Sequence, residues 1–233
     1  MKMKKLDDNK PILFLGDNHG NWSDLLFKIK TQKISNCIII SVGDMGIGFS
    51  PKQDIKNCES LNDVFKKSDI NFYGIRGNHD DPSAFKGDSR ICLDNFELIE
   101  DYSVYEHNSK LIQFVGGAIS IDRTGRRVGI SYWENEGVFF NRESCQKVDV
   151  LVTHTTISKC FPKEFNEMVY GWAREDAYLL EDLNDERSIL DEIFKICNPS
   201  LHLYGHFHSS YTEEIDGCKH KLLSINEIWE YRY

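Results

Sequence analysis

The sequence predicts an α/β fold for this chain of 233 residues. Five continuous apolar runs of strand length recur along the chain, and segments with helical spacing follow several of them. In the middle and at the end of the chain, short apolar stretches alternate with turn residues, which indicates antiparallel strands. The length and the 40% hydrophobic content suit one substantial core, so we expect a single domain over residues 1–233.

Strand and helix units make up the predicted first half of the chain. The apolar run 11–16 lacks alternation, which is typical of a strand buried on both faces. The segment after it places Trp22, Leu25 and Ile29 at helical spacing. The same reasoning predicts, in order, a strand at 11–16, a helix at 22–30, a strand at 37–42, a helix at 52–67 and a strand at 70–76.

The second half of the chain is predicted to be more varied. Polar turns between short apolar stretches indicate an antiparallel hairpin or meander over 96–121. The apolar residues of the segment 122–137 show no helical or strand periodicity, so we expect a long loop there. A long ordered loop in a compact domain is usually functional or mobile. The remaining expected elements are a strand at 148–153, a helix at 174–197, a strand at 201–204 and two alternating strands within 211–225 about an Asp-Gly turn.

The charge of the chain limits its partners. Its formal net charge is -9 and its pI is about 5.4, and its lysines cluster only at Lys2, Lys4 and Lys5. Affinity for duplex DNA or RNA comes mainly from many lysine and arginine contacts with phosphate, so we expect no duplex nucleic acid partner. The same charge argues against a nuclease acting on single-stranded ends, whereas a nucleotide substrate stays open.

Neither the cysteines nor the hydropathy indicates export or a membrane. The seven cysteines are scattered and never form C-x-x-C, so we expect free thiols that pack as small hydrophobic groups rather than a zinc ribbon or a disulfide framework. The lysines near the N-terminus precede polar residues instead of an apolar signal region, and no apolar stretch is long enough to span a bilayer. We therefore expect a cytoplasmic protein with no membrane partner.

Polar residues that can bind metal follow each of the five strand-like runs. The carboxyl ends of strands in β-α units share one edge of a sheet, so residues far apart in the sequence converge there. Taken alone, Asp17 could cap a helix, and His206 and His208 could be exposed loop residues. Seven such residues together favour a metal site: Asp17, His19, Asp44, Asn78, His154, His206 and His208.

The order of these motifs resembles the calcineurin-like metallophosphoesterase superfamily, and the match spans residues 17–208. The superfamily pattern is D-x-H, G-D, G-N-H-[DE], H and G-H-x-H. The matching residues are Asp17-Asn18-His19, Gly43-Asp44, Gly77-Asn78-His79-Asp80, His154 and Gly205-His206-Phe207-His208. The resemblance implies a four-layer α/β/β/α sandwich of two mixed sheets with flanking helices.

The resemblance also implies a binuclear metal centre. One ion would be held by Asp17, His19 and His208, and the other by Asn78, His154 and His206, with Asp44 bridging the two. Mixed nitrogen and oxygen ligands suit transition metals better than Ca²⁺ or Mg²⁺. We take manganese as the first candidate, with iron, zinc, nickel or cobalt as alternatives.

By the same resemblance, His79 is the general acid and Asp80 orients its ring. The expected reaction is hydrolysis of a small phosphomonoester or phosphodiester, including a nucleotide, by a metal-bridging hydroxide. A serine/threonine protein phosphatase is an alternative, but the arginine that such enzymes carry in their second motif is missing after Asp44. A non-catalytic scaffold of the same fold is the other alternative, and the oligomeric state stays open.

The loop 122–137 contains three candidate substrate-binding arginines, Arg123, Arg126 and Arg127. Guanidinium groups suit phosphate oxygens, and the segment 116–123 resembles one that precedes the fourth histidine motif in some bacterial and phage-type metallophosphatases. Trp133 could stack on a base or anchor this loop.

Four other residues are assigned structural roles. His107 and His220 are expected in hairpin turns and His202 inside a strand, each as an exposed or a packed histidine. Arg76 could form a salt bridge.

Overall fold

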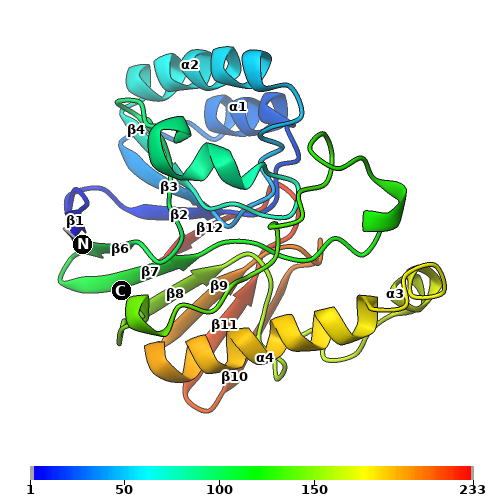
Figure 1. Cartoon of the computed structure of the whole chain (residues 1–233). Helices are drawn as coiled ribbons and strands as arrows, with labels where there is room; N and C mark the ends of the chain where they lie inside the picture. The colour runs from blue at the N-terminus through cyan, green and yellow to red at the C-terminus, as the bar shows by residue number, and fades with distance from the viewer. Residues whose placement is uncertain (1–2, 232–233) are drawn as a thin grey trace.

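Two β-sheets lie face to face, with helices on the outside of each (Figure 1). The structure is a computed structural model that describes residues 3–231, so Lys2 lies outside the described part. Helices α1 (Trp22–Thr31) and α2 (Pro51–Lys67) cover one sheet, and α4 (Leu179–Cys197) covers the other. The predicted four-layer α/β/β/α sandwich is confirmed.

The first sheet has five strands in the order β12-β2-β3-β4-β5. The four strands from β2 to β5 are parallel, and β12 pairs antiparallel with β2 at the edge. The crossovers through α1 and α2 account for the parallel pairing of β2, β3 and β4. The strands are β2 (Ile12–Leu15), β3 (Cys37–Ser41), β4 (Ile70–Gly74), β5 (Phe96–Leu98) and β12 (Ile228–Tyr231).

The second sheet has seven strands in the order β1-β6-β7-β8-β9-β11-β10. Its central strands β7, β8, β9 and β11 are parallel, while β6 and β10 are antiparallel to their neighbours β7 and β11. The strands are β1 (Lys4–Lys5), β6 (Val104–His107), β7 (Lys110–Val115), β8 (Val150–Thr153), β9 (Leu201–Tyr204), β10 (Tyr211–Ile215) and β11 (Cys218–Leu222).

Side chains alternate between the two faces of strand β9. Leu201 and Leu203 point into the core between the sheets, where they pack near Phe14 and Phe114. Tyr204 belongs instead to the core beneath α4, because successive residues of a strand point to opposite faces. His202 shares that outer face, and its ring lies 5.8 Å from the ring of Phe194 on α4.

Several elements differ from the prediction. The helix expected from 174 begins at Leu179, because the Asp176 carboxylate accepts the N–H of Tyr178 and shapes a turn before the helix. The short helix α3 (Glu167–Trp172) was not predicted, and neither were β1 and β12, whose pairing with distant strands defines them. Two histidines expected in hairpin turns lie in strands instead: His220 within β11, and His107 as the last residue of β6.

The connecting segments contain short 3₁₀ turns. These are η1 (Pro82–Phe85), η2 (Gly87–Ser89), η3 (Arg123–Gly125) and η4 (Arg142–Ser144). The segment 122–137 contains η3 and is otherwise irregular, as the lack of a period indicated. No helix among residues 3–231 is both long enough and apolar enough to cross a bilayer.

Candidate metal centre

The seven predicted metal-binding residues lie together in loops that follow β2, β3, β4, β8 and β9. The two sheets contribute to one site, because the main-chain N–H of His206, after β9, donates to the carboxylate of Asp17, after β2. The convergence that the sequence predicted at the strand ends is therefore present.

The first group of candidate ligands is Asp17, His19, Asp44 and His208, whose ligand atoms all lie within 4.8 Å of one another. The Nε2 atom of His208 lies 3.4 Å from Asp17 Oδ2. The Nε2 atom of His19 lies 3.7 Å from Asp44 Oδ2 and 2.9 Å from His208 Nε2. Two carboxylates and two imidazoles that face one point are a donor set that fits a divalent transition metal.

The second group contains Asp44, His154 and His206, again with ligand atoms within 4.8 Å of one another. The Oδ1 atom of Asn78 joins it, 3.2 Å from His154 Nε2 and 3.0 Å from His206 Nδ1. The NH₂ group of the Asn78 amide donates to the Ser120 hydroxyl. This hydrogen bond turns the amide oxygen of Asn78 toward the two histidines. Since Asp44 belongs to both groups, the donor sets fit two neighbouring ions that share one carboxylate.

The backbone at the site adopts conformations that non-glycine residues rarely have. Four candidate ligands have positive φ angles: His19 (50°), Asp44 (51°), His206 (69°) and His208 (52°). Each such residue costs roughly 1–3 kcal/mol, which the surrounding structure has to offset. Gly77 is required by close packing, because a Cβ there would lie 2.1 Å from Asp44 Oδ1.

Burial and mutual charge shift the titration of these groups. Burial raises the pKa of Asp17 to about 7. Burial also acts to raise the pKa of Asp44, but the positive charge of His154 outweighs it and holds that pKa below its ordinary value. The pKa of His154, which burial alone would lower, is raised to about 10 by Asp44. A divalent ion bound between the two carboxylates would supply positive charge in place of the His154 proton.

His79 lies at the mouth of the site, where its main-chain N–H donates to Asp44 Oδ1. Its Nε2 atom lies 2.9 Å from Nη2 of Arg126. A guanidinium can only donate, so Nε2 accepts and the proton of the neutral ring sits on Nδ1. Burial, supported by the charge of Arg126, lowers the pKa of His79 to about 4.

The Asp80 carboxylate bonds to the main chain. Its Oδ2 atom accepts the N–H groups of Met45 and Gly77, and its Oδ1 atom accepts that of Ile47. We expected Asp80 to orient the ring of His79; the Nε2 atom of that ring bonds to Arg126. Through these bonds Asp80 connects the loops that follow β3 and β4.

The three loop arginines occupy different environments. Arg126 bonds to Asp122 and lines the cavity at the site. Arg123 was expected near substrate, but it forms ion pairs with Asp176 and Asp182 and so fastens the loop to the start of α4. Arg127 is exposed.

Two aromatic and basic residues that the sequence left open have structural contacts. Trp133 is 7% exposed and its ring meets that of Phe49 edge-on at 5.5 Å, so it anchors the loop. Arg76 forms the ion pair with Asp101 that was one of its predicted roles.

A cavity of about 520 Å³ opens beside the candidate ligands. Its polar lining includes Asn78, His79, Arg126 and His206. The segment 161–172, which the sequence did not indicate as part of the site, contributes most of the apolar lining: Phe161, Pro162, Met168, Val169 and Trp172. The signal that could have indicated this wall is the apolar and aromatic content of a segment that lacks strand or helix periodicity.

Comparison with known proteins places this geometry in context. The sequence profile described as calcineurin-like phosphoesterase matches residues 10–210. No curated protein matches the chain.

Solved structures that resemble the chain share little sequence with it. A candidate 5′-nucleotidase from Staphylococcus aureus is 12% identical with a TM-score of 0.47, and the match covers 93% of this chain and 49% of that one, so this chain spans about half its length. GAP50, the anchor in the inner membrane complex of Plasmodium, is 14% identical (TM-score 0.45, 92% and 72% covered). The phosphopantetheinyl hydrolase of Mycobacterium tuberculosis is 12% identical (TM-score 0.43, 95% and 92% covered).

Proposed function

We propose, from the premise that this chain belongs to the calcineurin-like phosphoesterase family, that it is a metal-dependent hydrolase of small phosphate esters. One observation carries the proposal: two groups of ligand atoms share the buried carboxylate of Asp44, and His79 and Arg126 stand beside them. The cofactor we propose is a pair of divalent ions, with manganese as the first candidate.

Each candidate ligand is assigned to one or both ions of such a centre. Asp17, His19 and His208 would hold one ion, Asn78, His154 and His206 the other, and Asp44 both. When bound, two divalent ions activate a water molecule and stabilise charge on phosphoryl oxygens. Ser120 would keep the Asn78 oxygen aimed at its ion through the hydrogen bond to the Asn78 amide.

Arg126 would couple substrate binding to the availability of His79. Its guanidinium group donates to His79 Nε2, and the same planar fork suits two phosphate oxygens. When a phosphate group enters the cavity, Arg126 would turn from the imidazole to the phosphate and release Nε2. The negative phosphate then favours protonation of His79, which donates its proton to the leaving oxygen.

The shape of the cavity supports a small substrate with an apolar leaving group. A volume of about 520 Å³ lies within the range of small-molecule sites. Phe161, Val169 and Trp172 line the same cavity as Arg126, so a flat ring such as a nucleobase could pack on them while its phosphate faces Arg126. A nucleotide is therefore the substrate class that we place first.

Metal content and hydrolysis of a panel of nucleotides and aryl phosphate mono- and diesters test this proposal. We expect two manganese ions per chain and turnover in the wild-type protein, and both ions without turnover in His79→Asn. Hydrolysis that persists undiminished in His79→Asn would contradict the role of that residue. Two bound ions with no turnover of any ester would contradict the enzymatic proposal and favour the scaffold alternative.

A further inference from the structure

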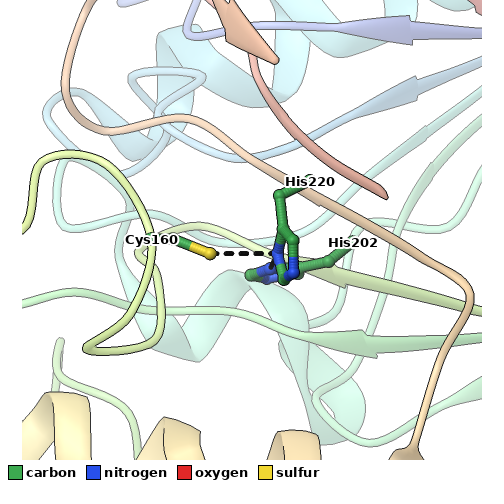
Figure 2. Close-up of side chains that lie close together, drawn as sticks. All are labelled: Cys160, His202 and His220. Carbon is green, nitrogen blue, oxygen red and sulfur yellow. Dashed lines mark hydrogen bonds between the residues drawn. The ribbon is translucent and has the colours of Figure 1, made fainter. Parts of the chain in front are cut away.

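Three side chains with metal-binding chemistry meet beneath α4, on the outer face of the seven-stranded sheet (Figure 2). His202 on β9 is paired in register with His220 on β11, and Cys160 lies in the segment between β8 and α3. All three are at most 1% exposed. Since His202 lies on the face of β9 opposite to Leu203 and the core between the sheets, this cluster is separate from the candidate centre around Asp44.

The potential ligand atoms of the cluster converge on Nδ1 of His220. The Cys160 Sγ atom lies 3.0 Å from it, as drawn in Figure 2, and His202 Nδ1 lies 3.1 Å from it. In a tetrahedral zinc site, bond lengths of roughly 2.0–2.3 Å place neighbouring ligand atoms roughly 3.3–3.6 Å apart. These two separations fall short of that spacing by a few tenths of an ångström, and all the ligand atoms of the cluster lie within 4.8 Å of one another.

The hydrogen bonds determine which nitrogen of His202 carries its proton. The Thr153 hydroxyl donates to the carbonyl of Thr155, which can only accept. Thr153 Oγ1 must then accept from His202 Nε2, which lies 2.8 Å away. Burial lowers the pKa of His202 well below its ordinary value, so the ring is neutral. The Nδ1 atom of His202 therefore carries no proton, and its lone pair points at His220.

Protons alone leave this cluster unsatisfied. If His220 Nδ1 carries a proton for His202, the bare Nε2 of His220 is buried without a hydrogen-bond partner among the described residues. If the ring proton of His220 is on Nε2 instead, the Nδ1 atoms of His202 and His220 face each other at 3.1 Å, both without a proton. The thiol proton of Cys160 can then be donated to only one of them. Burial lowers the pKa of His220, so its ring is neutral like that of His202 and carries a single proton. Two lone pairs and a thiol directed at one point form a site for a cation.

We propose that Cys160, His202 and His220 bind one thiophilic d¹⁰ metal ion of the zinc class through Sγ and the two Nδ1 atoms. Sulfur and imidazole nitrogen together are the ligands that zinc prefers. The His202 Nε2–H that donates to Thr153 is the outer hydrogen bond that orients a metal-bound histidine. The buried Thr156 hydroxyl, which has no hydrogen-bond partner among residues 3–231, lies beside the thiol and offers a fourth contact.

Binding would release one proton. The S–H bond of Cys160 breaks, the thiolate forms the metal–sulfur bond, and the proton passes to solvent. Because burial raises the pKa of the free Cys160 thiol to about 12, the affinity for the ion should increase with pH.

The ion would fasten one wall of the cavity to the sheet. Phe161 follows Cys160 directly and lines the cavity beside the candidate ligands. Its N–H donates to Glu213, and its carbonyl accepts from the Tyr204 hydroxyl, so the main chain here already bonds to strands β9 and β10. A metal bond at Cys160 would add a third anchor at the adjacent residue.

Cobalt spectroscopy of the full chain tests this site separately from the centre around Asp44. A thiolate bound to Co²⁺ produces a near-ultraviolet charge-transfer band, which the nitrogen and oxygen ligands of the other centre cannot produce. We expect the wild-type protein to show this band, the band to strengthen as the pH rises, and zinc to remove it. Cys160→Ser should abolish the band, and His220→Gln should weaken cobalt affinity at this site by at least about tenfold.

Cys197→Ser is the matched control. Cys197 is equally buried in the same core, but its thiol donates to Gln113, so this variant should keep the band. A wild-type protein without the band, or a band that persists in Cys160→Ser, would overturn the proposal. The wild-type result needs no variant to fold, and it holds whether or not the protein hydrolyses phosphate esters.

Discussion

Replacing Asp80 with asparagine tests whether this residue acts on the backbone or on His79. In the structure, the two carboxylate oxygens accept the N–H groups of Met45, Ile47 and Gly77, and Asp80 is fully buried. An asparagine side chain has only one oxygen. If this oxygen takes the position of Oδ2, it still accepts the N–H groups of Met45 and Gly77. The NH₂ group of the asparagine then faces the N–H of Ile47, which loses its acceptor.

The expected loss of stability follows from the one hydrogen bond that the asparagine cannot make. One buried N–H without an acceptor costs about 1–3 kcal/mol, and the opposed NH₂ group adds to it. We therefore expect Asp80→Asn to lower the free energy of unfolding, measured by urea denaturation of the metal-free protein, by about 2–3 kcal/mol. Asp81→Asn is the control, because an asparagine can still accept the N–H of Ser83 at the start of η1.

A backbone role and a role at the His79 ring predict different results for Asp80→Asn. A backbone role predicts reduced stability and weaker metal binding together, because the loops that hold Asp44 and Asn78 lose a connection. A role confined to the ring of His79 predicts a lower kcat with unchanged stability. Wild-type stability in Asp80→Asn would refute the reasoning from hydrogen bonds.

Three further predictions concern the substrate, the metal and the pH. Arg126→Gln should lower kcat/KM about 10- to 100-fold in steady-state assays because a charged phosphate contact is lost, whereas the exposed Arg142→Gln should not. Ser120→Ala should weaken metal affinity about 10- to 100-fold in calorimetric titrations, because the Asn78 amide loses its acceptor. Burial raises the pKa of Glu186 to about 7, above its unfolded value of 4.5, so the native state holds an extra proton between these pH values. This carboxyl should therefore reduce stability as the pH rises through that window, by up to about 1.4 kcal/mol per pH unit, and Glu186→Gln should show a shallower decline in denaturation experiments on metal-free protein.

Each of these predictions can fail in a recognisable way. An unchanged kcat/KM in Arg126→Gln would mean that the substrate does not reach the guanidinium. Equal metal affinity in Ser120→Ala would show that the Asn78 oxygen needs no outside support. Parallel pH profiles for Glu186→Gln and the wild-type protein would mean that Glu186 does not take up a proton on folding.

The residues of the candidate centre could be predicted because their signal is local. A buried strand ends where its apolar run ends, and the residue types at that point are visible in the chain. Asp17, Asp44, Asn78 and His154 each follow such a run, and parallel strands bring their carboxyl ends to one edge. The order of strands and helices could be predicted for the same reason.

The roles of single side chains in the loops could not be predicted in this way. Arg123 and Arg126 are three residues apart in one loop and have the same chemistry, yet one pairs with Asp176 near α4 and the other reaches His79. Asp80 follows His79 directly but bonds to the backbone after β3. Which partner a side chain meets depends on segments that pack against it from elsewhere in the chain.

The sequence by itself determined the α/β class, the order of most elements and the seven residues that converge around Asp44, because hydrophobic period and strand ends are local properties. The tertiary structure alone decided that Arg126 faces His79, that the segment 161–172 forms the cavity wall, and that Cys160, His202 and His220 meet beneath α4. Cys160 is separated from His220 by 60 residues. Contacts of that range arise from the pairing of β9 with β11 and the packing of the loop after β8, and no local pattern encodes them.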